Sequence, residues 1–339
     1  MSGVVYDAVL LVSFGGPEGP DDVLPFLRNV VRGRGVPEAR LAAVAEHYQH
    51  FGGVSPINAQ CRELLTALRA ELDAADVGLP VYWGNRNWHP YLADTVATMR
   101  DEGVQRALAF VTSPFGSYSS CRQYLEDLAG ARATVGPGAP VIDKIRHYHD
   151  HPGYVGPHAD AVRAALGQLS DVEPARLVFT AHSVPSTMEE QSGPDGGRYS
   201  AQLRETAALV ADAAAPGLEW DLVWQSRSGP KHVPWLEPDI NEHLESIAAA
   251  GARGVVVSPI GFISDHVEVL WDLDMEAAAT AAQLGLRFVR AATPGADPRF
   301  VAMVRELILE RLDPSAPRVR LGALPVWDRC PTGCCTPKI

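Results

Sequence analysis

Short apolar runs alternate with amphipathic stretches along the chain. The runs are rich in β-branched residues and are bounded by Gly, Pro and polar residues, which predicts buried parallel strands. The amphipathic stretches place apolar residues three and four positions apart, which predicts helices. Strands are expected at residues 8–12, 80–85, 106–111, 176–181, 222–225, 255–257 and 287–290. Because strands and helices alternate, we predict a doubly wound, mostly parallel α/β architecture in both halves of the chain.

Two stretches rich in Gly and Pro, at 136–140 and 151–153, interrupt this pattern. They predict an N-terminal domain at 1–153, a C-terminal domain at 154–312 and a Cys-rich tail at 313–339. The second domain is expected to open with a helix from about Gly156. The loops after the strands at 106–111 and 255–257 both contain Ser-Pro, a bulky apolar residue and Gly. This likeness suggests two similar halves.

Composition narrows the class of protein. The chain has 339 residues and a net charge of −12, which argues against a surface for nucleic acid. No apolar run approaches the roughly 18 residues that a membrane helix needs. The first residues lack the basic segment of a signal peptide and lead directly into a predicted strand. We therefore expect a cytoplasmic protein without membrane insertion.

Three acidic residues follow the predicted strand at 255–257. Glu268, Asp272 and Glu276 are spaced four apart, and at about 100° per residue an α-helix would place them on one face. Trp271 belongs to the neighbouring apolar stripe. One interpretation is a solvated acidic surface; the other is a cation path or proton relay at the carboxyl end of a strand, where open α/β sheets bind ligands.

His182 directly follows the predicted strand at 176–181, and Glu268 follows another strand of the same half. Loops at one end of one sheet can converge, and a His facing a carboxylate forms a base whose protonated form is stabilised. A Ser–His–acid hydrolase using Ser183 or Ser258 is the competing interpretation, but the G-x-S-x-G turn is missing.

A basic cluster in this acidic chain includes Arg32 and Arg34. It reads either as solvated loop charge or as guanidinium groups that capture substrate carboxylates. Ser55 precedes Pro56 and is expected to cap the next helix.

The tail contains Cys330, Cys334 and Cys335 within six residues. Three thiolates need a fourth ligand to complete a Cys₄ site for zinc or for an iron–sulfur cluster, and both remain open. Cys61 lies on the apolar stripe of a predicted helix and is assigned to the core. Cys121 lies in a polar loop at a helix start, where a thiolate is favoured, and is the expected fourth ligand.

These residues together resemble the ferrochelatases, which insert ferrous iron into a porphyrin. The resemblance covers nearly the whole chain and rests on Val12-Ser-Phe-Gly-Gly-Pro, Arg32-Gly-Arg, Gly52-Gly-Val-Ser-Pro, Ala181-His-Ser-Val-Pro, Gln225-Ser-Arg-Ser-Gly-Pro and Ser258-Pro-Ile-Gly-Phe-Ile-Ser-Asp-His-Val-Glu. It implies two Rossmann-like domains with the porphyrin between them. It also implies that His182 is the catalytic base, that Glu268 is its partner, and that Asp272 and Glu276 lead the iron inward, so all four are expected to meet the metal.

The tail resembles that of family members with a [2Fe–2S] cluster, which take one cysteine from the first domain and three from the carboxyl end. The Cys-x3-Cys-Cys spacing is similar to the actinobacterial type, for which coproporphyrin III is the implied substrate. Protoporphyrin IX is the runner-up substrate. Phe14 stands where some members have an iron-ligating tyrosine, so a phenolate ligand from that position is excluded.

The resemblance leads to further expectations about substrate and partners. Phe14, Arg32, Arg34, Tyr48, Ser55, Ser117 and Tyr118 are the candidate contacts to the porphyrin and its propionates. We expect a monomer that makes transient contact with the next enzyme of the heme pathway. A non-catalytic porphyrin or heme carrier, and an interaction protein that binds a partner through its tail cysteines, are the alternatives from other classes.

Overall fold

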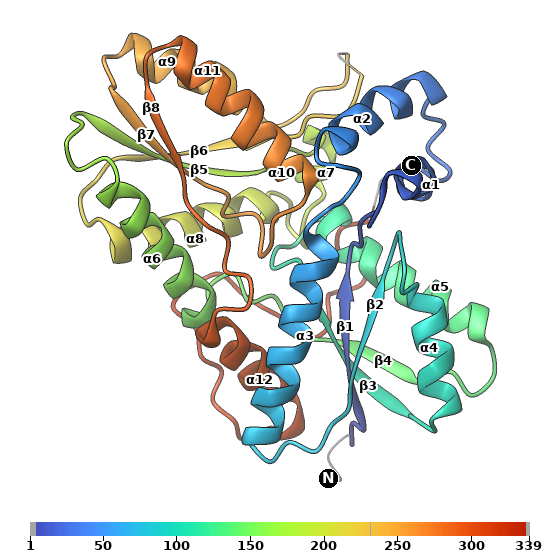
Figure 1. Ribbon diagram of the computed structural model, residues 1–339. Coiled ribbons are helices and arrows are strands. Elements are labelled where there is room, and N and C mark those ends of the chain that lie inside the picture. The colour runs from blue at the N-terminus through green and yellow to red at the C-terminus, as the bar shows by residue number, and fades with distance from the viewer. Residues whose placement is uncertain (1–4, 231, 337–339) are drawn as a thin grey trace.

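The computed structural model describes residues 5–230 and 232–336. Within these residues the strands form two four-stranded sheets in which every pair is parallel (Figure 1). The first sheet, in the order β2-β1-β3-β4, contains β1 (Ala8–Ser13), β2 (Val81–Asn85), β3 (Arg106–Val111) and β4 (Val141–Lys144). The second, in the order β6-β5-β7-β8, contains β5 (Ala175–His182), β6 (Trp220–Gln225), β7 (Gly254–Ser258) and β8 (Arg287–Arg290). The predicted fold class is confirmed.

The two sheets repeat one topology, because β5 to β8 take the same places in their sheet as β1 to β4. A loop follows both β3 and β7. It leads directly into the π-helical segment η2 (Tyr118–Arg122) in the first case, and through the short helix α10 into the π-helical segment η3 (Leu270–Ala277) in the second. The similarity suggested by the two Ser-Pro loops is therefore a structural one. The segments carrying β1–β4 and β5–β8 are called the first and second halves below.

Helices cover both faces of each sheet. Those of the first half are α1 (Val23–Val30), α2 (Glu38–His50), α3 (Ile57–Ala74), α4 (Leu92–Asp101) and α5 (Gln123–Val135), with a 3₁₀ turn, η1 (Pro20–Asp22). Those that follow are α6 (Pro152–Gly167), α7 (Ser186–Glu190), α8 (Arg198–Ala214), α9 (Ile240–Ala249), α10 (Val267–Val269), α11 (Ala278–Gln283) and α12 (Pro298–Leu312).

The central strands β1 and β7 are mostly apolar runs because both of their faces are buried. In β1, Val9 and Leu11 enter a large central core that also contains Phe179 and Val256 of the second sheet. The alternate residues, including Leu10, pack against α4 and α5 on the other face. Successive side chains of a strand point to opposite faces, so one short run serves two cores. Each fully buried aliphatic side chain contributes about 2 kcal/mol.

The two halves share this central core rather than meeting only at a linker. Helix α12 packs against both α3 and α6 (Figure 1). Helix α6 begins at Pro152, four residues earlier than expected, because proline in a first turn has no N–H to lose. The His151 ring accepts the Gly153 N–H at 3.0 Å and caps the helix. The domain division at residue 153 stays a prediction.

Among the described residues, none of the helices combines the length and the apolar character that crossing a bilayer requires.

Candidate functional site

The sequence-predicted residues gather at the carboxyl ends of the central strands. In the first sheet the chain passes from β1 to β2 on one side and then crosses to β3 on the other side of β1, and the second sheet repeats this path from β5. The point where the direction reverses is a switch point, at which open α/β sheets bind ligands. Phe14 follows β1, and Ser117, Tyr118 and Cys121 follow β3. In the second half His182 ends β5, and the segment after β7 carries Glu268. Both switch points are thus lined by candidate residues.

The structure brings His182 and Glu268 together. Nε2 of His182 lies 3.9 Å from Oε2 of Glu268, and the two side chains are 35% and 46% exposed, so a substrate can reach both. Nδ1 of His182 lies 2.5 Å from the Ser183 carbonyl oxygen. Since a carbonyl only accepts, Nδ1 carries the hydrogen and Nε2 is left as a proton acceptor. The Tyr199 hydroxyl donates to the His182 carbonyl at 2.9 Å and holds the strand end in place.

The structure argues against the hydrolase interpretation, because neither Ser183 nor Ser258 is placed to act as a nucleophile. The Ser183 hydroxyl donates to the Leu236 carbonyl at 2.9 Å. Ser258 is fully buried within β7.

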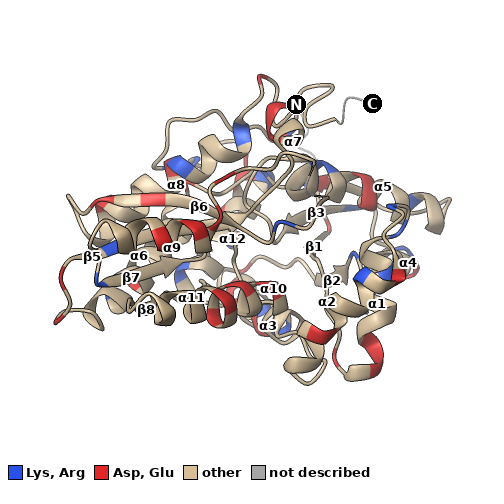
Figure 2. Ribbon diagram, turned by 90° about the horizontal axis from the view of Figure 1, so that it is seen from above, with Lys and Arg blue, Asp and Glu red and all other residues tan. Residues whose placement is uncertain are grey.

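The acidic segment after β7 is not the α-helix that the spacing predicted. A single turn, α10, leads into the π-helix η3, and α11 follows. Figure 2 shows acidic ribbon positions in red along this segment. A π-helix adds one residue to each hydrogen-bonded turn and occurs mostly at functional sites. Like charges four residues apart destabilise an α-helix. The α-helix is therefore weakened in this segment, and the wider π-helical turn forms here.

Asp272 is the most perturbed of these acids. Burial raises its pKa to about 7, and the neighbouring charges of Glu268 and Glu276 add to the rise. The Ser226 hydroxyl, from the loop after β6, donates to the Asp272 carboxylate and opposes the rise. At neutral pH this carboxyl group therefore exchanges readily between its charged and neutral forms.

Helix α2 of the first half covers this segment from the other side. The His47 ring stacks on the indole of Trp271 with centroids 3.9 Å apart and planes 8° apart. Burial lowers the pKa of His47, which keeps the ring neutral at pH 7. Trp271 donates its indole N–H to Oε1 of Glu276 at 2.9 Å. The sequence pattern assigned Trp271 to an apolar stripe and gave no signal for its contact with His47. This contact joins the two halves of the chain, so local spacing does not predict it.

Arg34 and Tyr118, two of the candidate porphyrin contacts, are accessible neighbours. Arg34 reaches Gln123 Oε1 at 3.5 Å, and its charge acts on Tyr118, whose hydroxyl donates to Glu126 at 3.1 Å. Arg32 is exposed on the same loop as Arg34 and donates to Asn29 Oδ1 at 2.5 Å.

The other candidate contacts are more enclosed. Tyr48 packs against Phe26, and burial raises its pKa well above the usual value, with a contribution from the charge of Glu268. Phe14 lies between the edge of Phe26 and the Arg86 guanidinium, which is 5.6 Å from the ring centre. Ser117 is buried and accepts the Ser120 N–H at 3.1 Å.

Ser55 does not cap the helix as expected. Helix α3 begins at Ile57 with Pro56 in the capping position, and none of the described side chains caps it. Ser55 is instead buried beneath Gly16, where a Cβ would lie only 2.7 Å from the Ser55 Cβ. The serine is used to pack the loop after β1, so its hydroxyl is not free to turn toward the helix end.

The tail cysteines meet the first half at Cys121. Cys121 contacts Cys330, which contacts Cys334. The sulfur atoms of Cys334 and Cys335 are 3.6 Å apart, and the Gly193 N–H donates to Cys335 at 3.1 Å. This chain of contacts supplies four thiols from two distant parts of the sequence, together with one N–H donor.

The prediction that the position of Cys121 favours its thiolate form is wrong. The contact with Cys330 raises the pKa of Cys121 and burial raises it further, whereas the same contact lowers the pKa of Cys330. Cys121 is buried near the end of η2. A thiolate at this position would have little access to water, so the helix start does not stabilise it. The assignment of Cys61 to the core is confirmed: it is 3% exposed, and burial raises its pKa to about 11.

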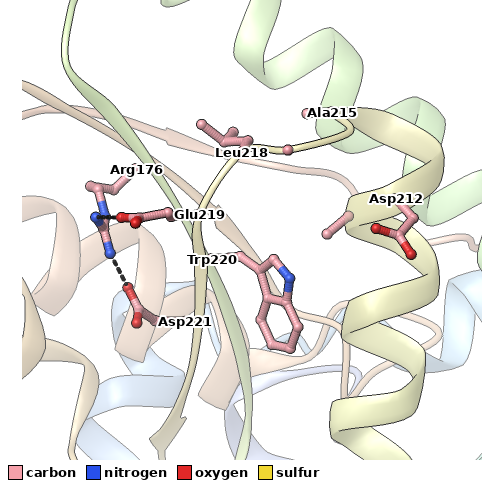
Figure 3. Close-up of a pocket in the computed structure, with 9 residues that line it drawn as sticks. Arg176, Asp212, Ala215, Leu218, Glu219, Trp220 and Asp221 are labelled. Carbon is pink, nitrogen blue, oxygen red and sulfur yellow. Dashed lines mark hydrogen bonds and ion pairs between the residues drawn. The ribbon is translucent and has the colours of Figure 1, made fainter.

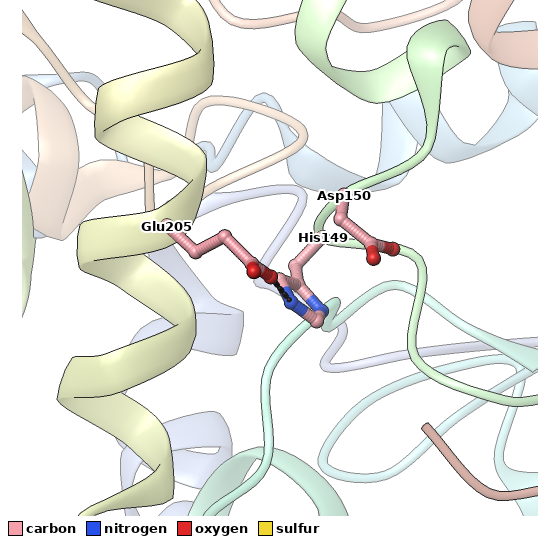
Figure 4. A group of neighbouring side chains, drawn as sticks. All are labelled: His149, Asp150 and Glu205. Atoms are coloured by element: carbon pink, nitrogen blue, oxygen red, sulfur yellow. Dashed lines mark hydrogen bonds and ion pairs between the residues drawn. The ribbon is translucent and has the colours of Figure 1, made fainter. Parts of the chain in front are cut away.

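A polar group unforeseen from the sequence anchors the tail (Figure 4). Glu205 of α8 accepts from His149 at 3.0 Å and from the N–H groups of Ala323 and Leu324 at 2.7 and 3.0 Å. Burial alone would raise the pKa of Glu205, but these hydrogen bonds hold it at about 2. Asp150 accepts from Arg320 at 2.8 Å.

The donor types of the His149, Asp150 and Glu205 group could bind a cation. Both oxygens of Glu205 and Oδ2 of Asp150 already accept hydrogen bonds, so the group serves as an anchor for the tail. Among the described residues, Oδ1 of Asp150 and Nδ1 of His149 have no partner. The sequence signal was the polar run from His147 to His151, in a segment that turns out to be buried.

A surface pocket of about 470 Å³ lies elsewhere (Figure 3). It is lined by residues at the start of β5, the end of α8 and the loop into β6, among them Arg176, Asp212 and Trp220. Arg176 forms ion pairs with Glu219 and Asp221. The pocket is at the amino end of the strand whose carboxyl end carries His182, so it is separate from the candidate site.

Comparison with protein families and curated sequences gives consistent results. Residues 6–312 match the family model described as Ferrochelatase. A protein of Nocardia farcinica described as coproporphyrin III ferrochelatase is 57% identical over 343 residues, covering 98% of this chain and 97% of its own. Proteins with the same description from Mycolicibacterium vanbaalenii and Streptomyces griseus are 54% and 53% identical, covering 98% and 97% of this chain and 98% and 93% of their own.

Among solved structures, "SirB from Bacillus subtilis with Fe3+" is similar with a TM-score of 0.51 and 14% identity. The match covers 89% of this chain and 96% of that one. At this identity the likeness concerns the fold alone, and it is consistent with two sheets of repeated topology.

Proposed function

The chain belongs to the ferrochelatase family, and from this premise we propose that it inserts ferrous iron into coproporphyrin III. The relatives that carry this description match it over nearly their whole length. The observation that carries the proposal is the accessible pair of His182, which is half-buried, and Glu268, 3.9 Å apart at a switch point of the second sheet. The reaction is that of a lyase in which one ferrous ion replaces two pyrrole protons.

In this proposal His182 is the proton acceptor. Its Nε2 faces Glu268 while Nδ1 is occupied by the Ser183 carbonyl, so the ring takes a pyrrole proton at Nε2. The Glu268 carboxylate stabilises the imidazolium that forms and takes part in removing the proton. The planar ring must also be distorted to expose its nitrogen lone pairs, for which binding energy from remote groups is available.

The iron path of the proposal runs along η3. Asp272 and Glu276 offer carboxylate oxygens, and Asp272 has a pKa of about 7. A strongly perturbed pKa is characteristic of carboxyl groups at functional sites. We assign the two acids to iron delivery toward Glu268 and His182.

The propionates of the substrate are assigned to the accessible side of the first half. Arg32 and Arg34 carry the positive charge, and Tyr118 adds a hydroxyl beside Arg34. Guanidinium groups suit carboxylates because they donate in a planar fork. Tyr48, Ser55 and Ser117 are buried, so in this proposal they shape the walls of the porphyrin site together with Phe14.

Steady-state kinetics with iron and free coproporphyrin III test the assignment. We expect His182→Ala to lower kcat by at least about 100-fold, in line with losing a positioned base, and Glu268→Gln to lower it in the same direction. His243→Ala is the matched control, since His243 pairs with Asp221 away from the site. Near-normal turnover of His182→Ala would contradict the mechanism.

The same assay separates the alternatives. A carrier would bind porphyrin without turnover in the wild type. A higher kcat/KM for protoporphyrin IX than for coproporphyrin III would assign the chain to protoheme formation instead.

We also propose that Cys121, Cys330, Cys334 and Cys335 hold a [2Fe–2S] cluster. Four thiols in one chain of contacts, with a Gly193 N–H directed at one sulfur, suit such a group. The bound group would supply one-electron chemistry and a covalent tie between η2 and the tail. Glu205 and Asp150 hold the tail segment that precedes the cysteines.

Anaerobic purification tests the cluster. The expected result is visible absorption with iron and acid-labile sulfide in equal amounts, lost in Cys335→Ser and kept in Cys61→Ser. Zinc in native mass spectrometry, an intact set of free thiols, or a partner protein held by the tail cysteines would contradict the assignment.

We further propose that the protein works in the cytoplasm as a monomer that passes its product to the next enzyme of the heme pathway by transient contact. Light scattering at micromolar concentration gives the oligomeric state, and a stable dimer would contradict this part of the proposal.

A further inference from the structure

The π-helical turn of η3 brings Trp271 and Glu276 together. Residues five apart lie one turn above each other in a π-helix, whereas in an α-helix they point about 140° apart. The indole N–H of Trp271 donates to Oε1 of Glu276 at 2.9 Å. The contact therefore exists because the helix is wider here, and it would be lost if the segment became α-helical.

Helix α2 supports the indole from the opposite half. The His47 ring stacks flat on Trp271 at 3.9 Å, and the His50 ring meets it edge-on at 5.6 Å. Two rings against one indole restrict its rotation, so the direction of its N–H is set by both halves of the molecule.

The chemistry of indole suits this position. Its nitrogen only donates, so it cannot compete with a carboxylate for a cation. It is also uncharged, so it orients Glu276 without neutralising it, as a Lys or Arg would. One carboxylate oxygen of Glu276 is held by the N–H, and the exposed side chain keeps the other oxygen available.

We propose that Trp271 is a positioning residue for iron: it holds Glu276 in the orientation that receives the ferrous ion, and His47 holds Trp271. This rests on the proposed function of η3 as the iron path. Without the indole N–H, the exposed glutamate samples several rotamers, and the ion must select the productive one.

Kinetics of Trp271→Phe test the proposal, because phenylalanine keeps the stacking and removes the N–H. We expect the KM for iron to rise about three- to tenfold, in line with the loss of one charge-assisted hydrogen bond. The KM for coproporphyrin III and kcat at saturating iron should stay within about twofold. Equal rises in the KM values of both substrates would indicate a general loss of structure and overturn the proposal.

A double-mutant cycle with Glu276→Gln sharpens the test. If Trp271 acts through Glu276, Trp271→Phe should have almost no effect on the iron KM in the Glu276→Gln background, whereas additive effects would refute the link. His47→Phe keeps a flat ring and should behave like the wild type, while His47→Ala should shift the iron KM in the direction of Trp271→Phe.

Metal binding without porphyrin separates this proposal from the proposed function. Co²⁺ titrated into the wild type and followed by calorimetry should bind in a saturable manner, more weakly in Glu276→Gln and in Trp271→Phe. A wild type that binds Co²⁺ but does not turn over would refute the chelatase assignment alone. Identical Co²⁺ affinity in wild type and Trp271→Phe would refute the role of Trp271.

Discussion

Replacing Asp272 by Asn should stabilise the protein, and more so as the pH rises. The pKa of Asp272 lies at about 7 in the folded chain against a usual 3.8, chiefly through burial. Between these two values the folded state holds a proton that the unfolded state has lost. The free energy of unfolding therefore falls as the pH rises through this window, and the penalty is complete above pH 7.

The size of the effect follows from the same two values. At about 1.4 kcal/mol for each pH unit, the difference between 3.8 and about 7 corresponds to roughly 4 kcal/mol. Asp272 keeps partial access to solvent, which screens the charge, so we expect about half of this in total. The advantage of Asp272→Asn over the wild type should then grow by about 1–2 kcal/mol between pH 5 and pH 8.

Urea unfolding at constant ionic strength measures this advantage at each pH. Ser226→Ala is the companion variant: the Ser226 hydroxyl lowers the pKa of Asp272, so without it the decline in wild-type stability should extend to higher pH. An advantage that is equal at pH 5 and pH 8, or larger at pH 5, would show that Asp272 does not carry the proton in the folded state.

Two further predictions concern the packing that holds the halves together. Arg146 and Glu310 form a pair with side chains 1% and 2% exposed, so Glu310→Gln strands a buried charge and should cost about 3–5 kcal/mol in chemical unfolding. The double change of both residues to Met should recover part of this, and equal losses would contradict the reasoning. A Cβ on Gly153 would lie 2.5 Å from the Arg299 carbonyl oxygen, so Gly153→Ala should cost about 1–3 kcal/mol. Gly130→Ala, with open space on an exposed part of α5, should instead stabilise by about 0.5–1 kcal/mol, and a similar sign for both would refute the steric argument.

The amino-acid sequence by itself determined the local elements and their order. Runs such as 106–111 and 287–290 are strands with the predicted ends. The first is buried almost throughout and is mostly apolar, whereas the second lies at a sheet edge and has an apolar pair between two arginines. Helix α12 begins after Asp297, whose carboxylate accepts the Arg299 N–H at 2.8 Å and caps the helix. Motifs at strand ends also marked His182 and Glu268, because parallel strands end at one edge of their sheet.

Tertiary structure alone decided the features that depend on contacts between distant residues. The width of the η3 turn depends on what packs against it, and four-residue acid spacing is equally compatible with an α-helix. From the sequence alone Trp271 is an apolar residue. In the folded chain the His47 ring stacks on its indole, and Glu276 accepts a hydrogen bond from its N–H. The burial of Ser55 and Cys121 could not be predicted from the local sequence pattern. It is the reason that Ser55 does not cap its helix and that Cys121 is not at a position favouring a thiolate. Burial is also the main reason that Asp272 has a pKa near neutrality.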